Sequence, residues 1–156
     1  SSTRTLRTRS TTCLYFATDE PLTAEPVLHL DGDLRGPVNH ACVLSAVSSD
    51  YAPPGQHLIS CSIIGSPSSV ELEAVVREQM SGWFGESASR WRHLRTYQIR
   101  NAVPITRQMD VGAGSLAGEV RPGVYRCGDY TEDPTINGAL LSGTRAADEI
   151  LSKLSS

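Results

Sequence analysis

Four short apolar runs, separated by turn-rich links, occupy the first part of the chain. The runs are residues 13–17, 27–30, 41–47 and 58–64. Each run has the length of a β-strand, and proline, glycine, aspartate and serine are frequent in the links between them. Short links of this kind suit antiparallel neighbours. The sequence therefore predicts a mostly antiparallel or mixed β-sheet.

One helix is expected to follow these strands and to cover the sheet. Ser68 and Glu71 have the spacing of a capping box, in which side chain and backbone satisfy each other's free N–H groups. Gly82 or Gly85 can end the helix. The apolar residues recur at helical spacing and should pack into the core; they are Leu72, Val75, Val76, Met80 and Trp83.

For the rest of the chain, the sequence predicts a strand, an irregular stretch and a strand–helix unit. Residues 91–100 alternate well enough for a strand that Pro104 stops, and residues 106–122 are glycine-rich and irregular. Residues 123–127 form a further short strand. The helix over residues 136–154 has apolar positions near one face, at Ile136, Leu140, Ala147, Ile150 and Leu151. The predicted class is α+β.

Composition excludes several classes of protein. The chain has 156 residues, of which 39% are hydrophobic and 20% charged, so a packed core is expected and wholesale disorder is not. The formal net charge of −3 argues against a nucleic-acid binder, which usually shows a basic excess. No apolar run is long enough to predict a transmembrane helix.

The cysteines and histidines do not have metal-site spacing. The cysteines lie in apolar segments without a C-x-x-C pair, and we interpret them as reduced core residues; they are Cys13, Cys42, Cys61 and Cys127. The histidines are scattered and are interpreted as solvated or packed residues; they are His29, His40, His57 and His93. No metal site is predicted.

The first 18 residues contain Arg4, Arg7 and Arg9 and no acidic residue. A transit peptide has this composition, but a strand with exposed arginine and threonine explains it as well, and we favour the strand. The missing initial methionine suggests a fragment or a processed chain. We expect an intracellular protein, in the cytoplasm or a plastid.

The most informative segment is the strand-to-helix turn near the C-terminus. Gly128 and Asp129 follow the strand, and small residues crowd the first turns of the helix, at Gly138, Ala139, Ser142, Gly143 and Ala146. Such a helix permits the close approach of backbone or of a flat ligand. Its free N–H groups favour an anion or a carbonyl, and a carboxylate at the strand end can accept hydrogen bonds from hydroxyls. The pattern predicts a polar ligand at this turn.

This segment closely resembles the C-terminal flavin-binding motif of the flavin-containing amine oxidase and phytoene desaturase superfamily. The matching residues are GVYRCGD at 123–129 and PTINGALLSGTRAA at 134–147. Weaker likenesses cover residues 91–104, a strand that ends in Ala-x-Pro, and residues 48–59, a turn into a strand. Together they touch about half of the chain, and only the final motif is specific.

The resemblance implies a cofactor, FAD, and a set of residues that contact it. Asp129 matches the carboxylate that hydrogen-bonds the ribityl and pyrophosphate region, and Gly128 permits its close approach. Ile136, Asn137 and Gly138 match the helix start, whose N–H groups face the isoalloxazine ring and stabilise negative charge on the reduced flavin. The resemblance names no catalytic acid or base.

Two departures from the family pattern matter. The strand–GxGxxG–helix unit that binds the ADP half of FAD is absent, and Gly112–Gly118 has one residue too many to replace it. Thr135 stands where monoamine oxidases place an aromatic residue beside the flavin. The desaturase-like side of the superfamily therefore fits better than an aromatic cage for an amine.

The resemblance implies two partial domains. Residues 1–105 would be part of a substrate-binding domain, and residues 106–156 the C-terminal strand–helix segment of an FAD-binding domain. We expect the C-terminal part of an FAD-dependent oxidoreductase, inactive as this chain alone, with a small apolar or amine-like substrate. The alternative is a non-catalytic binding or assembly module that holds no flavin. The terminal unit can also pair with a second copy in a homodimer.

Overall fold

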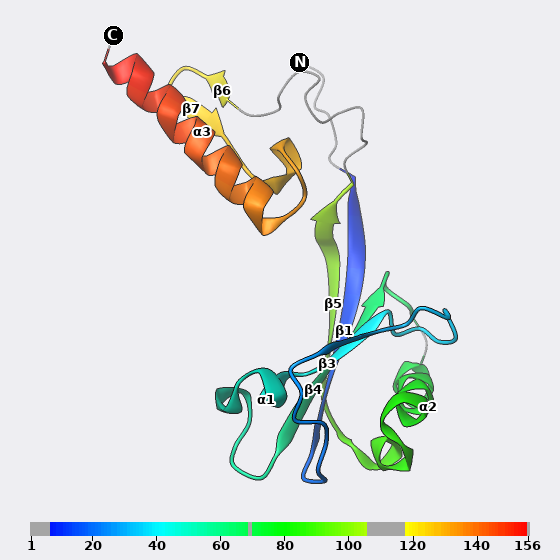
Figure 1. The fold of residues 1–156 in the computed structure, drawn as a ribbon. Helices are drawn as coiled ribbons and strands as arrows, with labels where there is room; N and C mark the ends of the chain where they lie inside the picture. The colour runs from blue at the N-terminus through cyan, green and yellow to red at the C-terminus, as the bar shows by residue number, and fades with distance from the viewer. Residues whose placement is uncertain (1–6, 69, 106–117, 156) are drawn as a thin grey trace. The chain divides into compact units, whose positions relative to one another are not determined.

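The computed structural model describes residues 7–68, 70–105 and 118–155. Its contacts divide the chain into two units, Ser10–Arg100 and Ser1–Arg9 with Asn101–Ser156. The larger unit contains most of a five-stranded antiparallel sheet in the order β2-β3-β4-β1-β5 (Figure 1). The strands are β1 (Thr8–Thr18), β2 (Leu28–Leu30), β3 (His40–Val43), β4 (His57–Ile64) and β5 (Arg92–Pro104). The predicted α+β class is confirmed.

The register places alternate apolar residues of three neighbouring strands on one face. Phe16 lies opposite Ile59, which lies opposite Val43, and the next row joins Leu14, Cys61 and Ala41. All six side chains are buried. The period of two along a strand puts the intervening residues on the other face, where Tyr15, Ser60 and Cys42 are only half-buried. This alternation is the pattern on which the strand prediction depends.

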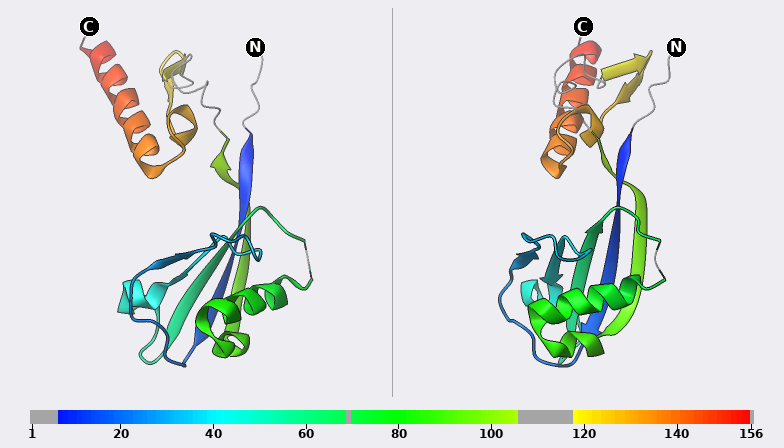
Figure 2. Two further views of the ribbon diagram at one scale, coloured as in Figure 1. Left: turned by 45° about the vertical axis from the view of Figure 1, so that its right-hand side comes forward. Right: turned by 90° about the vertical axis from the view of Figure 1, so that its right-hand side faces the viewer.

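The helix α2 (Leu72–Phe84) covers the buried face of the sheet (Figure 2). Val76 and Met80 are fully buried in the core, and Leu72 and Trp83 pack against it. Full burial of a side chain such as Val76 or Met80 stabilises the fold by about 1.5–3 kcal/mol. Gly85, with φ of +84°, ends the helix, as predicted. Val75 departs from the predicted stripe, since its side chain is exposed.

The predicted capping box at Ser68 is wrong. The helix begins at Leu72, the first residue whose side chain reaches the core, and Glu71 occupies the N-cap position without a side-chain capping bond. The capping-box spacing depends on nearby residues only, whereas most of the stability of a helix in a protein comes from tertiary packing. Tertiary contact at Leu72 therefore decided the start of this helix.

Part of the third predicted strand is also wrong. After Val43 the chain leaves the sheet as α1 (Leu44–Val47), followed by a 3-10 turn, η1 (Ser49–Tyr51). The Ser45 hydroxyl accepts a hydrogen bond from the Leu58 N–H at 3.2 Å. This bond satisfies a β4 donor that a longer β3 would have paired, so the apolar run can continue as helix.

Arg77 ties α2 to the start of β5. Its guanidinium donates to Glu73 Oε1 at 2.7 and 3.0 Å and to the Trp91 carbonyl oxygen, which follows the 3-10 helix η2 (Glu86–Arg90). The same guanidinium lies 5.1 Å from the centre of the Phe16 ring. A half-buried arginine thus connects the helix, the strand that follows it and the core.

The smaller unit holds a hairpin and the long C-terminal helix. Strands β6 (Gly118–Arg121) and β7 (Val124–Arg126) pair antiparallel, and a 3-10 turn, η3 (Asp129–Thr131), leads to α3 (Ile136–Leu154). The predicted strand and helix are confirmed, whereas part of the stretch predicted to be irregular is the strand β6. Residues 106–117 of the glycine-rich stretch lie outside the described residues.

Candidate functional site

A closed ring of hydrogen bonds joins the end of β7 to the middle of α3. The Gly128 N–H donates to Ser142 Oγ at 2.9 Å, and Thr131 Oγ1 donates to the Gly128 carbonyl oxygen at 2.7 Å. Ser142 and Thr131 lie 2.6 Å apart between their hydroxyl oxygens. Because the Thr131 proton is already used, Ser142 donates to Thr131 and the ring closes. Ser142 is fully buried, and the ring sets the position of Gly128.

Gly128 adopts a backbone conformation that requires glycine. Its φ is +146°, and a Cβ atom at this position would lie 2.5 Å from the Tyr130 ring. The chain therefore turns sharply as it leaves β7 and places Asp129 at the start of η3. Asp129 is half-buried, and within the described residues its carboxylate has no hydrogen bond and no ion pair. These oxygens are available to accept hydrogen bonds from a ligand.

The start of α3 retains two N–H groups for a ligand. Thr135 is the N-cap, and its Oγ1 accepts a hydrogen bond from the Gly138 N–H at 3.1 Å. The same hydroxyl donates to Asp133 Oδ2 at 3.2 Å. In the part of the chain that the structure describes, Ile136 and Asn137 are the first-turn residues whose N–H groups have no acceptor. These groups also lie at the positive end of the helix dipole.

The small residues of α3 face the connection that precedes the helix. Gly138, Ser142 and Ala146 are buried at intervals of four residues. A Cβ atom at Gly138 would lie 1.8 Å from the Asp133 carbonyl oxygen. The protein's own backbone therefore occupies the space at this glycine. By contrast, a Cβ atom at Gly143 would meet nothing within 4 Å.

The apolar stripe predicted for α3 is not its buried face, because small residues permit a closer approach than leucine or isoleucine. Exposed apolar side chains on this helix include Ile136, at 81% of its accessible area, Leu140 and Leu151.

Ion pairs hold the middle and the C-terminal end of α3 against neighbouring segments. Arg145 pairs with Glu132 in the connection, and Lys153 pairs with Glu119 of β6 and with Glu149. Lys153 lowers the pKa of the Glu119 carboxyl by donating a hydrogen bond to it. The Lys153 ammonium also lies 5.0 Å from the centre of the Tyr125 ring. The Lys153 contacts position the hairpin on the helix, and the Arg145 pair fixes the connection at Glu132.

The sequence-predicted site residues thus fall on one connection. Gly128 and Asp129 lie at the end of β7, and Thr135, Ile136, Asn137 and Gly138 open α3. Sequence reasoning missed the positioning roles of Thr131 and Ser142. The only signal for Ser142 was its place among small residues, because its partners Gly128 and Thr131 lie 14 and 11 positions away in sequence.

The cysteine and histidine side chains do not form a common site. All four cysteines are free, but only Cys61 is buried in the core. Cys13 and Cys42 are half-buried outside it and Cys127 is exposed, so the prediction of four core cysteines is wrong at three positions. His93 Nδ1 lies 3.2 Å from Glu73 Oε2. Among the described residues, no three histidine, cysteine or acidic side chains are placed to hold a metal ion, and no helix is long and apolar enough to cross a membrane.

Comparison with known families identifies the chain. Residues 1–151 match the family described as flavin containing amine oxidoreductase. The chain belongs to this family. The match extends over both structural units, so the family resemblance that the C-terminal motif carries is confirmed for nearly the whole chain.

One of the solved structures that match is similar enough to show a shared fold. An oxidoreductase from Methanosarcina mazei matches with a TM-score of 0.57 and 20% identity, over 97% of this chain and 35% of that chain. A reduced UDP-galactopyranose mutase matches over 64% of this chain and 23% of that chain, with 16% identity and a TM-score of 0.43. The family chain described here therefore spans about a third of the solved oxidoreductase. A search of curated proteins found no match.

Proposed function

We propose that this chain is the C-terminal part of an FAD-dependent oxidoreductase and contributes contacts to the flavin. The observation that carries the proposal is the single connection that presents Asp129 and the N–H groups of Ile136 and Asn137 without partners among the described residues. A carboxylate matches the hydroxyls of a ribityl chain. Two N–H donors at a helix N-terminus match an electron-rich carbonyl edge. This donor set fits FAD.

Each residue of the turn has a distinct role in the proposed site. Asp129 accepts hydrogen bonds from the ribityl and pyrophosphate region, and Gly128 permits its approach. Ile136 and Asn137 donate toward the pyrimidine edge of the ring, where the helix dipole favours negative charge. Thr135 and Gly138 act on the protein side, because the Gly138 N–H is already bonded to Thr135 Oγ1. FAD, when bound, would supply hydride acceptance from a substrate C–H or C–N unit.

The five-stranded sheet is proposed to contribute to the substrate cavity. Its face opposite α2 carries Tyr15, whose ring packs edge-on against that of Tyr97 with 5.9 Å between the ring centres. The exposed side chains of Leu28 and Leu30 lie on the same face. Aromatic and aliphatic surface of this kind suits a small apolar or amine-like substrate. We accordingly assign residues 1–105 to a substrate-binding domain and residues 106–156 to the FAD-binding domain.

Flavin retention by the full-length protein tests the proposal. Asp129→Asn removes the charge and keeps the side-chain volume, so the purified variant should carry less FAD per protein, measured by the visible absorbance of the flavin and by chromatography of released FAD. Asp148→Asn is the matched control, since Asp148 is an exposed carboxylate on α3 that the donor set does not use. Equal flavin content in both variants would refute the assignment of Asp129.

A non-catalytic assembly module is the second candidate. The exposed Ile136 and Leu140 side chains on α3 favour it, since such a surface is suited to packing against further protein. A wild-type protein that is purified without flavin and that elutes as a dimer would support this candidate. A flavin-containing monomer would exclude it.

A further inference from the structure

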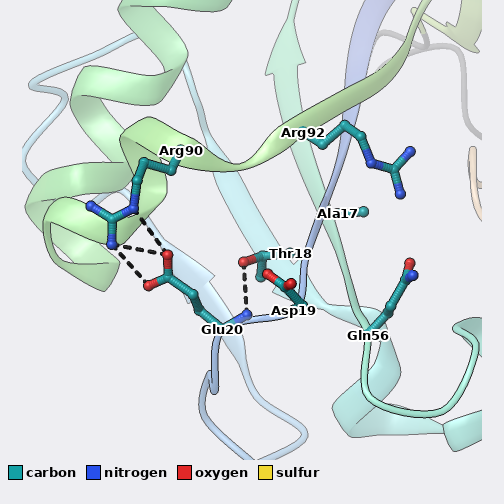
Figure 3. Close-up of a pocket in the computed structure, with 7 residues that line it drawn as sticks. All are labelled: Ala17, Thr18, Asp19, Glu20, Gln56, Arg90 and Arg92. Atoms are coloured by element: carbon teal, nitrogen blue, oxygen red, sulfur yellow. Dashed lines mark hydrogen bonds and ion pairs between the residues drawn. The ribbon is translucent and has the colours of Figure 1, made fainter.

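A polar pocket lies at one end of the five-stranded sheet, entirely within residues 17–92. Its walls come from the end of β1, the residue before β4, and the chain around the start of β5 (Figure 3). The pocket has a volume of about 260 Å³ and is lined by Ala17, Thr18, Asp19, Glu20, Gln56, Arg90 and Arg92. None of these residues belongs to the proposed flavin turn, so the pocket is a separate candidate site.

Two of the four charged side chains in the pocket neutralise each other. The Arg90 guanidinium donates from Nε to Glu20 Oε1 and from Nη2 to Glu20 Oε2, both at 3.0 Å. The Glu20 backbone N–H is in turn bonded to Thr18 Oγ1 at 3.1 Å. This bidentate ion pair fixes one wall of the pocket and leaves no net charge on that wall.

The other two charged side chains face the pocket without partners. In the described part of the chain, the side chains of Arg92 and Asp19 have neither a hydrogen bond nor an ion pair, and the carboxamide of Gln56 has none either. Figure 3 shows the Arg92 guanidinium and the Gln56 carboxamide directed toward the same space, with the Asp19 carboxylate beside Thr18. The pocket thus has a donor-rich basic side and an acidic side.

We propose that this pocket binds a small zwitterion that carries one ammonium and one carboxylate group, such as a free amino acid. The carboxylate would accept hydrogen bonds from Arg92 and Gln56, and the ammonium would pair with Asp19. A simple anion would be repelled by Asp19 and a simple cation by Arg92, so a ligand with both charges is favoured over either. The volume suits a molecule of this size, and the proposal does not depend on the flavin site.

Titration of the intact protein with a series of ω-amino acids tests this proposal. Glycine, β-alanine and γ-aminobutyrate differ in the separation of their charges, while acetate and methylammonium carry one charge each. At constant ionic strength, amide NMR spectra should show the Gln56 side-chain signals moving with one zwitterion of the series. That zwitterion should bind about tenfold more tightly than either singly charged compound. Acetate or methylammonium binding as tightly as every zwitterion would overturn the proposal.

Substitutions test which residues of the pocket bind the zwitterion. Arg92→Gln and Asp19→Asn should each weaken binding of the preferred zwitterion about tenfold. Arg95→Gln is the matched control, since Arg95 is on the same strand but lies over the Tyr97 ring and does not line the pocket. Gln56→Ala provides a third, exposed position if either charge variant lowers the melting temperature. Unchanged binding in Arg92→Gln, or an equal loss in Arg95→Gln, would contradict the assignment.

Discussion

We expect a substitution of Gln79 to destabilise the larger unit clearly. Its carboxamide pairs with the backbone of Val38 as a strand would: Oε1 accepts from the Val38 N–H at 2.8 Å, and Nε2 donates to the Val38 carbonyl oxygen at 2.9 Å. Nε2 also donates to Asp31 Oδ2 at 3.1 Å. Val38 is fully buried, so water does not replace these bonds.

Gln79→Leu leaves both backbone groups of Val38 buried and unpaired. Each unsatisfied group costs about 1–3 kcal/mol, so the two together cost about 2–6 kcal/mol. The leucine side chain recovers part of this through apolar contact, and we expect a net loss of about 2–4 kcal/mol. This is a large fraction of the roughly 5–15 kcal/mol by which a typical domain is stable.

Urea unfolding measures this loss. The fluorescence of Trp91, which is buried in the core, reports the transition. Gln98→Leu is the matched control, because the Gln98 amide makes one exposed hydrogen bond, to the Pro67 carbonyl oxygen at 3.0 Å, and should cost less than about 0.5 kcal/mol. If Gln79→Leu and Gln98→Leu change the free energy of unfolding equally, the argument from buried backbone groups is refuted.

Three further predictions concern α3 and the core. Gly138→Ala should lower the melting temperature and the free energy of unfolding, the latter by about 1–3 kcal/mol, because the new Cβ collides with the Asp133 carbonyl oxygen. Gly143→Ala should raise the melting temperature, because its Cβ would lie in open space and alanine favours a helix over glycine. Thermal unfolding of both variants checks these opposite signs. Burial raises the pKa of the Cys61 thiol to about 12, so iodoacetamide at mildly alkaline pH should modify the exposed Cys127 and spare Cys61 until the protein unfolds. Since the unfolded thiol loses its proton first, stability should also fall as pH rises from the ordinary thiol pKa toward 12, and urea midpoints across that range check it. Equal modification of both cysteines in the native protein, or equal shifts for both glycine variants, would contradict these arguments.

Several features of the fold could be predicted from local sequence because their physical cause is local. Alternation in residues 13–17 and 58–64 places apolar side chains on one face of any strand, and Gly85 ends α2 through its own positive φ. The helix over Ile136–Leu154 follows from its long run of helix-compatible residues. The resemblance at residues 123–147 led directly to the family that the comparison confirms.

The incorrect predictions were decided by particular backbone contacts, one between residues 13 positions apart and one between residues only about five apart. The third run stops being a strand at Val43, where the Ser45 hydroxyl takes over the Leu58 N–H. The apolar residues of α3 were expected inside, but the connection at Asp133 approaches so closely that Gly138 faces it instead. The spacing of the apolar residues does not register either contact.

The sequence by itself determined the alternating strands, the presence of the two longer helices and the Gly-Asp turn, because side-chain period, glycine conformation and residue type are properties of short segments. Only the tertiary structure decided that Ser142 and Thr131 close a ring of hydrogen bonds around Gly128, and that Gln79 serves as a backbone partner for Val38. Both arrangements satisfy polar groups that folding removes from water, and their partners are known only once the chain has folded.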